Sequence, residues 1–228
     1  SPKLSQTSNN IFLNEKLLAR VKSIYDKKEQ LNLSTEDAKL LEDLYESFKA
    51  NGATLNKDDK EKYRKLSMDL SMLTLQFDQN ALKDKNRFEL LITDENELSG
   101  LPESARDAAA MLAKSKDKNG WLFNLSAPSY IPFMRYSDKR DLREKMYREY
   151  MSVGNKGDEF DNKDIIKKIV NIRLEIAQLM GFKNYAEYAL EHTMAKNSAN
   201  VYKLLNQLLE AYKPIAINEY LSLIHIWR

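Results

Sequence analysis

The sequence contains no cysteine and only two histidines among its 228 residues. The lack of cysteine excludes disulfides, thiolate nucleophiles and cysteine-ligated metal sites. Lys and Arg total 36 against 34 for Asp and Glu, so the net charge of +2 supplies no long-range field to attract nucleic acid or an anionic membrane. No apolar run approaches the length of about 20 residues that spans a bilayer. We therefore expect neither nucleic acid nor a membrane among the partners of this chain.

Glycine and proline are also scarce, at six and five, and most long segments repeat apolar residues at helical spacing. This pattern predicts a mainly α fold, a multi-helix array. Two short runs of β-forming residues, 88–93 and 121–126, predict one two-stranded ribbon. Because no linker or repeat interrupts residues 1–220, one helical region is favoured over two domains.

Capping residues and apolar stripes locate the predicted helices. Helices should begin at Asn14 and Ser34, and these two should form a hairpin. A longer helix should cover about 57–81, and others should follow Pro102 and Asp138. The remaining helices should begin at Asp161 or Asn162, at Asn184 and at Ser198. The residues expected to point inward in the hairpin and the last helix are Leu17, Val21, Ile24, Leu40, Leu41, Leu44, Phe48, Val201, Leu204, Leu205, Leu208 and Tyr212.

The end of the chain carries two further expectations. Pro214 should kink or end the last helix, because its ring removes an amide donor and clashes with the preceding turn. Residues 221–228 (LSLIHIWR) stop in the middle of a pattern without a capping signal. We interpret this octet as a foreign tail, and an ordinary continuation of the helix is the alternative.

The two histidines, His192 and His225, do not form a zinc-binding pair. Two histidines that bind one zinc ion from a helix must lie one turn apart, yet Lys196 stands four residues beyond His192. Glu191 is adjacent to His192, and neighbouring helical residues point about 100° apart. We expect His192 to be a hydrogen-bonded or solvated histidine at a helix end.

Other chemistry finds little support in the sequence. A serine nucleophile needs a histidine base, and neither histidine lies in a glycine-rich turn such as Gly-x-Ser-x-Gly. The sequence therefore does not support a serine hydrolase. Three carboxylates, Asp138, Asp141 and Glu144, lie among arginines 135, 140, 143 and 148 at ion-pair spacing, which is typical of a solvated face.

A cluster of aromatic residues offers a possible binding surface. Tyr130, Phe133 and Tyr136 could line a peptide groove near Pro128 and Pro132, with core packing as the commoner alternative. The sequence thus assigns no catalytic, cofactor-binding or metal-binding residue.

Several short blocks, taken in order, resemble one enzyme family. The family is that of the zinc metallopeptidases thimet oligopeptidase and peptidyl-dipeptidase Dcp, and the bacterial Dcp enzymes resemble the chain most. The likeness covers about 66–212 and rests on the order and spacing of the blocks. The blocks are 97–103 (ELSGLPE), 120–130 (GWLFNLSAPSY), 138–143 (DKRDLR), 180–186 (MGFKNYA) and 194–195 (MA).

The resemblance implies a channel-forming, almost wholly helical peptidase that admits short peptides. Family members bind zinc through the two histidines of His-Glu-x-x-His and a later glutamate, and the glutamate of the motif is the general base. None of these residues has a counterpart in this chain, so no zinc is expected on the chain alone.

The resemblance also assigns a part to each region of the longer protein. The chain would be a channel wall that is inactive alone, and a missing C-terminal portion would carry the catalytic motif. The alternative is a non-enzymatic helical module that binds peptides or partner helices. A cytoplasmic location is expected, with the periplasm as the alternative.

Overall fold

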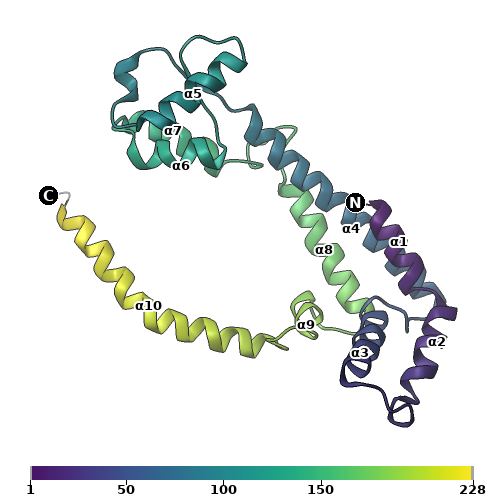
Figure 1. Cartoon of the computed structure of the whole chain (residues 1–228). Helices are drawn as coiled ribbons and strands as arrows, with labels where there is room; N and C mark the ends of the chain where they lie inside the picture. The colour runs from purple at the N-terminus through teal and green to yellow at the C-terminus, as the bar shows by residue number, and fades with distance from the viewer. Residues whose placement is uncertain (1, 227–228) are drawn as a thin grey trace. The chain divides into compact units, whose positions relative to one another are not determined.

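Helices make up most of the chain in the computed structural model, which describes residues 2–226 and the side chains of residues 2–222 (Figure 1). The predicted mainly α fold and the single short ribbon are both confirmed. In chain order the elements are α1 (Pro2–Phe12), α2 (Glu15–Tyr25), the 3-10 turn η1 (Lys28–Gln30), α3 (Thr35–Ala50), α4 (Lys57–Arg87), β1 (Leu90–Ile92), the 3-10 turn η2 (Glu95–Leu98), α5 (Glu103–Ser115), β2 (Trp121–Phe123), α6 (Ala127–Tyr136), α7 (Arg140–Met151), α8 (Lys163–Leu179), α9 (Tyr185–Leu190) and α10 (Ser198–Ile226).

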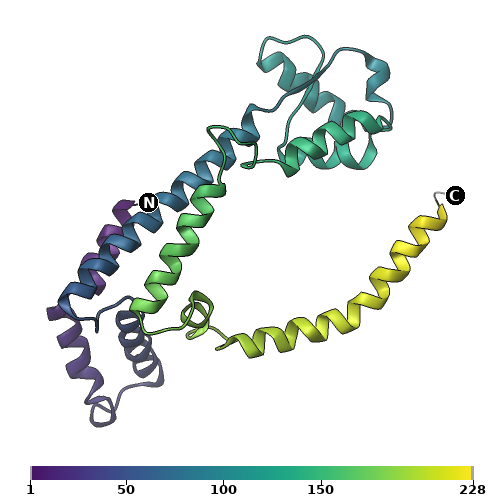
Figure 2. The ribbon, with the colours of Figure 1, turned by 180° about the vertical axis from the view of Figure 1, so that it is seen from behind.

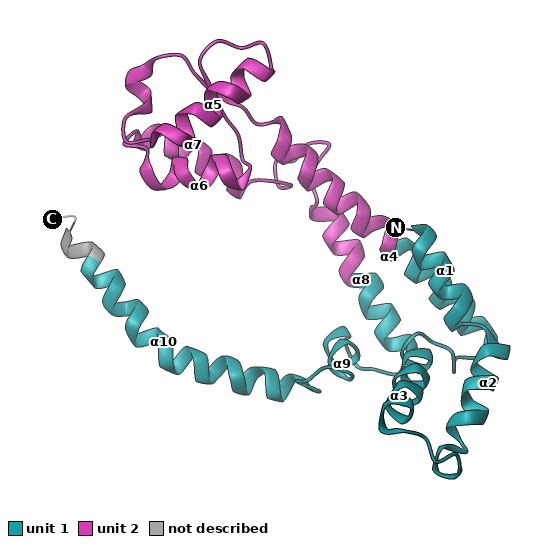
Figure 3. Ribbon diagram, viewed as in Figure 1, with its two compact units in different colours: residues 1–70, 171–228 teal, residues 71–170 magenta. Residues whose placement is uncertain are grey.

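The chain divides into two compact units, which Figure 3 shows in different colours. The first unit consists of residues 1–70 and 171–228, and the second of residues 71–170. Both boundaries fall inside helices, α4 and α8, that continue without a break. A boundary inside a helix needs no Pro- or Gly-rich linker, which explains why the sequence favoured a single unit.

Helices α2 and α3 form the predicted hairpin of the first unit. Asn14 accepts hydrogen bonds from the first-turn amides of α2, and the Ser34 hydroxyl accepts one from the Asp37 amide at 3.1 Å. Both predicted N-caps are therefore confirmed. Tyr25 of α2 stacks on Tyr45 of α3 with ring centroids 4.1 Å apart, which ties the two helices together.

The hairpin is less buried than its apolar stripes predict. In α2 no residue is buried, and Leu17 and Ile24 are exposed. In α3 only two of the four expected residues are buried, while Leu40 and Leu44 are exposed. The prediction was wrong for these positions because α2 and α3 pack mainly on each other, and each helix of such a pair covers only one narrow strip of its partner.

The core of the first unit lies between α4 and α8 and not beneath the hairpin. Leu13, which follows the unpredicted helix α1, is buried together with Tyr63 and Leu66 of α4 and Ile176 of α8. Burial raises the pKa of the Tyr63 phenol above its ordinary value. The Tyr188 hydroxyl donates to the carbonyl of α3 residue Ala50 at 2.8 Å, so α9 is fixed to α3.

Helix α10 departs most from expectation. Leu204, Leu205, Leu208 and Tyr212 were expected to point inward, but each side chain is exposed. Pro214 does not end the helix, which continues to Ile226. Proline fixes φ near the helical value and removes only one donor, so a long helix can retain it at a cost.

The foreign-tail prediction falls mostly outside the described side chains. The backbone of residues 221–226 continues α10, whereas the side chains of residues 223–228 are not described. The origin of the octet 221–228 stays a prediction.

The second unit contains the predicted two-stranded ribbon, which is antiparallel and is shortened to three residues in each strand. Leu90 pairs with Phe123 and Ile92 with Trp121. Gly120 enters β2 at a φ of 112°, where an added Cβ would lie 2.3 Å from the Ile92 carbonyl oxygen. Only glycine allows this approach of the two backbones.

The core of the second unit, which Figure 2 shows from behind, forms where α5 packs on β2 and α6 packs on α5 and α7. Phe133 of α6 meets Phe123 of β2 edge to face, with centroids 4.8 Å apart, and both side chains are buried. Met146 brings α7 into the same cluster. The buried members are Phe88, Leu90, Ile92, Leu98, Leu101, Ala109, Phe123, Leu125, Phe133 and Met146.

Helix α8 confirms its predicted stripe and its predicted end. Asp161 caps it by accepting a hydrogen bond from the Lys163 amide at 2.9 Å. Gly181 follows the helix at a φ of 87°, the left-handed conformation that terminates many helices. Along the stripe Ile165, Ile169 and Ile176 are buried, and Ile172 and Met180 are partly buried.

Candidate functional site

His192 lies beyond the end of α9, in the turns that lead to α10. Its Nε2 is 3.4 Å from the Glu191 carboxylate, and both side chains are about half exposed. The expectation that these neighbours point apart was wrong, because it assumed a helix where the chain turns. No third possible ligand joins the pair among the described side chains, and nearby Asp43 and Glu46 bind Lys39 and Lys49 at 2.7 and 2.9 Å.

The carboxylates of the α7 region do not form an acid–base pair. Glu144 binds Arg148 at 2.7 Å on the exposed face of α7, as the spacing predicts. Asp138 instead accepts a hydrogen bond from the Ser99 hydroxyl at 2.6 Å. Arg143 donates to the carbonyl of Ser137. This region is a solvated polar face with local structural contacts.

The aromatic residues of α6 do not share one groove. Phe133 is fully buried, whereas Tyr136 is 46% exposed. Tyr130 stacks on Tyr150 of α7, with centroids 4.3 Å apart. Steps of three residues turn a side chain by about −60° around the helix, so the three rings spread over different directions.

A hollow of about 220 Å³ does lie beside α6, on its amino-terminal side. Small side chains of α5 leave space against β2 and the first turn of α6. Its polar rim is already paired: the Ser129 hydroxyl accepts from the Asn124 amide at 3.0 Å, and Asn124 accepts from the Ser126 hydroxyl at 2.6 Å. The hollow could receive an apolar side chain but holds no activated nucleophile. Its lining comprises Ala105, Ala108, Ala109, Leu112, Leu122, Phe123, Asn124, Ser126, Pro128 and Ser129.

The most constrained polar cluster surrounds Asp84, the only fully buried carboxylate among the described side chains. One carboxylate oxygen accepts from the Gly154 amide at 2.7 Å. The other binds Lys156 at 3.1 Å and Arg87 at 2.7 Å, and Arg87 also binds Asp158. We call this cluster the Asp84 clamp; its members are Asn80, Asp84, Arg87, Glu149, Gly154, Lys156, Asp158 and Asn162.

The clamp balances its buried charge. Burial lowers the pKa of Lys156, but hydrogen bonds to Glu149 and Asp84 raise it more, so the net shift is upward and the ammonium stays charged. The Arg87 guanidinium lowers the pKa of the Asp158 carboxyl through its hydrogen bond. Both oxygens of Asp84 are occupied, so this carboxylate cannot serve as a proton donor or acceptor for a substrate.

Asparagines complete the clamp. Asn80 of α4 donates to the Asn162 side-chain oxygen at 3.0 Å, and Asn162 donates to the carbonyl of Phe77 at 3.0 Å. Asn162 is therefore a bridge from the start of α8 to α4, while Asp161 is the cap. These bonds hold the segment between α7 and α8 on α4.

Gly154→Ala tests how tightly the clamp is packed. Gly154 has a φ of 70°, and an added Cβ would lie 3.1 Å from Nδ2 of Asn162. We expect an alanine to lower the free energy of unfolding by about 2 kcal/mol, from the left-handed backbone and the contact. Chemical denaturation followed by circular dichroism measures the change.

Gly157→Ala is the matched control. Gly157 has a similar φ of 72° but nothing within 4 Å of its added Cβ. The Gly157→Ala change should therefore lower the free energy of unfolding by about 1 kcal/mol, from the backbone conformation alone. Equal losses for the two variants would show that the clamp is loose at Asn162.

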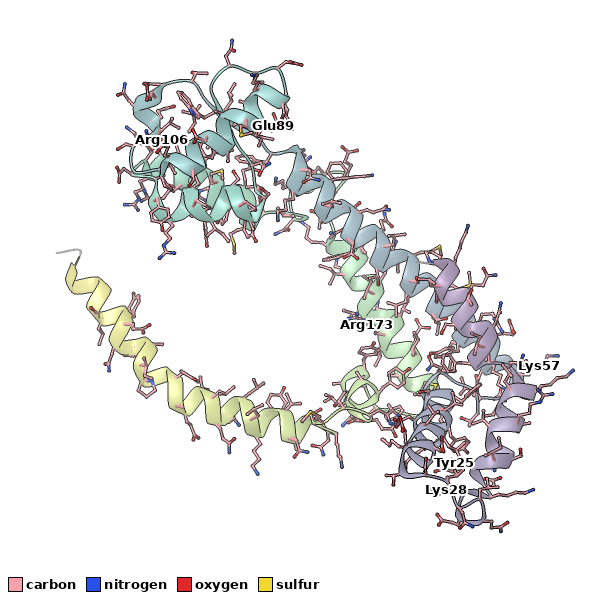
Figure 4. All side chains as sticks on the ribbon, viewed as in Figure 1. Tyr25, Lys28, Lys57, Glu89, Arg106 and Arg173 are labelled. Carbon is pink, nitrogen blue, oxygen red and sulfur yellow. The ribbon has the colours of Figure 1, made fainter. Side chains whose placement is uncertain are left out.

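Acid should weaken the second unit. Hydrogen bonds from Lys116 and Lys118 lower the pKa of Glu89, whose place Figure 4 labels. The hydrogen bond from the Lys163 amide lowers the pKa of Asp161. A lowered folded-state pKa adds stability above the ordinary values of 4.5 and 3.8, and this stability is lost as pH falls through the folded-state pKa. We expect the urea midpoint to fall as pH drops below these values.

The variant Glu89→Gln isolates one contribution to the acid response. It should be less stable than the parent chain at neutral pH, and the difference should shrink in acid. A difference that stays constant with pH would contradict the assignment of Glu89.

Two absences apply to the described residues. Through residue 222, no three His, Asp or Glu side chains gather where they could hold a metal ion. In the same part of the chain, no helix combines the length and the apolar character needed to cross a bilayer.

The model of Peptidase family M3 matches residues 133–228. The chain is 35% identical over 217 residues to oligopeptidase A of Salmonella typhimurium, covering 93% of this chain and 32% of that protein. It is 31% identical over 224 residues to the dipeptidyl carboxypeptidase of Escherichia coli, covering 98% of this chain and 33% of that protein. It is 38% identical over 181 residues to the probable cytosolic oligopeptidase A of Arabidopsis thaliana, covering 76% of this chain and 26% of that protein.

The chain thus spans about a third of the length of the first two of these relatives. Identity to oligopeptidase A exceeds identity to the dipeptidyl carboxypeptidase, contrary to the expectation that Dcp is the nearer relative. The alignments with the first two relatives cover nearly the whole chain, and the family model covers residues 133–228. On this evidence the chain belongs to peptidase family M3, the family of thimet oligopeptidase and Dcp.

Proposed function

We propose that this chain is a non-catalytic part of a zinc-dependent peptidase that hydrolyses short peptides, and that it forms a wall of the substrate channel. The observation that carries the proposal is identity of 35% along 93% of the chain to an oligopeptidase about three times as long. Relatives named as oligopeptidases and as a dipeptidyl carboxypeptidase support peptide hydrolysis as the activity of the whole protein.

The described residues do not fit a zinc site. His192 has one carboxylate neighbour, Glu191, and a zinc ion needs three or four ligands around one point. The side chain of His225 lies outside the described residues. We infer that the zinc ligands and the general base come from the part of the longer protein that this chain does not match. The chain alone is then inactive.

The role left to this chain is mechanical. The Asp84 clamp fixes the connection between α7 and α8, and the cluster around Phe133 fixes the ribbon and its helices. Rigid supporting elements are what a peptidase needs to hold an extended substrate near its reacting groups. The hollow beside α6 is a candidate contact for an apolar side chain of the peptide.

The test compares this chain with the complete gene product. We expect the complete protein to bind zinc and cleave a quenched fluorescent peptide, and the chain alone to do neither. An inactive complete protein without zinc would contradict the proposed function. Fractionation of the source cells tests the proposed cytoplasmic location, with recovery in the periplasm as the opposing result.

The alternative is a helical module that binds peptides without cleaving them. The hollow of about 220 Å³ beside α6 is the observation in its favour. Short peptides that bind the isolated chain, together with a complete gene product that has no hydrolase activity, would support this alternative.

A further inference from the structure

Helix α10 carries a broad apolar stripe that the described structure leaves uncovered. At 100° per residue the stripe extends over roughly 160° of the helix, from Leu204 round to Tyr202. Leu205 is 51% exposed and Leu209 58%. Lys203, Gln207 and Glu210 occupy the opposite face. The α10 stripe consists of Val201, Tyr202, Leu204, Leu205, Leu208, Leu209, Tyr212, Ile215 and Ala216.

The width of the stripe decides what kind of partner fits it. Pairing of two helices in a coiled coil uses a narrow seam of two positions in seven, which would leave much of this stripe in water. A stripe this wide is typical of a helix that packs its apolar face on the core of a globular protein. A second copy of α10 is therefore a poor match.

The relatives indicate where such elements would come from. The family model matches residues 133–228, so α10 lies within the matched stretch. The first relatives are about three times as long as this chain, so most of their polypeptide has no counterpart here. This unmatched polypeptide is large enough to supply a layer of helices.

We propose that the α10 stripe is the docking surface for the remaining two thirds of the peptidase, the part that carries the catalytic residues. The inference rests on the proposed function for the identity of that part. Through this contact α10 joins the wall formed by the chain to the catalytic portion of the same polypeptide. The stripe ends at Ala216, so it does not involve the octet 221–228.

The test uses a chimaera in which this chain replaces the matching stretch of Escherichia coli oligopeptidase A. The tethered partner is then present at high effective concentration. Leu205→Lys places a charge in the stripe, and Gln207→Lys places the same residue on the opposite face. Leu, Gln and Lys have similar helix propensities, so the pair differs mainly in location. Amide hydrogen exchange of α10 and the thermal midpoint are measured in the chimaera and in the isolated chain.

In the chimaera we expect α10 to be protected, and Leu205→Lys to speed its exchange by roughly tenfold or more while Gln207→Lys does not. In the isolated chain both variants should leave exchange in α10 and the thermal midpoint unchanged. Three results would overturn the inference: equal effects of the two variants in the chimaera, an unprotected α10 in the chimaera, or a chimaera with the native stripe that does not fold. Loss of self-association of the isolated chain through Leu205→Lys, without protection in the chimaera, would assign the stripe to a second copy.

The outcome separates this inference from the proposed function. A protected α10 in a chimaera, combined with a complete native gene product that neither binds zinc nor cleaves peptides, would retain the docking surface and reject the peptidase. An active complete gene product combined with an unprotected α10 in the chimaera would retain the peptidase and reject the docking surface.

Discussion

Replacing Asp84 with alanine should lower the free energy of unfolding of the second unit by about 3 kcal/mol, because the change leaves a buried amide and two cations without their shared acceptor. Asp84 is fully buried and accepts from Gly154, Lys156 and Arg87. Losses on breaking a buried ion pair run to about 5 kcal/mol. We expect the lower end here, since the side chains of Lys156 and Arg87 are 19% and 38% exposed and can regain water. Urea denaturation followed by circular dichroism gives the value.

Asp164→Ala is the control for this prediction. Asp164 also forms an ion pair, with Lys167 at 3.2 Å, but both side chains are more than 70% exposed. Its removal should cost less than about 0.5 kcal/mol. The conservative Asp84→Asn change should fall between the two, because an amide oxygen can still accept from Gly154. If Asp84→Ala cost no more than Asp164→Ala, the clamp would not stabilise the fold.

Truncating Phe133 to alanine should cost about 3 to 5 kcal/mol, the range for removing a large buried aromatic side chain. Phe133 is fully buried and meets Phe123 edge to face, so the change removes both the transfer free energy and an aromatic contact. The cavity cannot close easily, because β2 and α7 hold its other walls. Thermal and urea unfolding of the variant measure the loss.

Ile131→Ala on the same helix is the matched control. Ile131 is 58% exposed, so its truncation should change stability by less than about 1 kcal/mol. A Phe133→Ala variant that unfolds at the same urea concentration as Ile131→Ala would show that α6 is not anchored in the core.

Local signals made much of the fold predictable. The caps at Asn14, Ser34 and Asn184 were correct because a side-chain acceptor beside free amides is a short-range interaction. Gly181 was correct because the end of a helix is also a local feature, and the α8 stripe was correct because other elements of the described chain cover the face that its periodicity marks. The ribbon was predicted from composition, and only its length was overestimated.

The sequence also carries a signal for the Asp84 clamp, which the predictions did not include. The stripe of α4 runs Tyr63, Leu66, Leu70, Leu73 and Phe77, and the same spacing of three and four continues to Asn80 and Asp84. The prediction ended this helix at Ala81 because the apolar pattern stops. Polar residues that continue an apolar stripe are buried when partners from elsewhere in the chain satisfy them. Here the partners come from residues 154–162, 70 to 85 positions away, and local reasoning cannot find them.

The α10 stripe shows the opposite failure. Its periodicity identifies an apolar face that is suited to burial, yet no part of the described chain covers that face. An apolar stripe identifies a face that needs a partner but not where that partner is encoded. The same limit applies to catalysis, since a chain with a single described histidine shows its family through order and spacing of blocks while the reacting groups are expected elsewhere.

Zinc content and peptide cleavage of the purified 228-residue chain, measured together after incubation with zinc, test the central claim most directly. The account predicts no stoichiometric zinc and no cleavage of a quenched fluorescent peptide, because His192 and Glu191 stand without further ligands among the described residues. One equivalent of bound zinc accompanied by peptide cleavage would contradict it, and would place a complete hydrolytic centre within this chain.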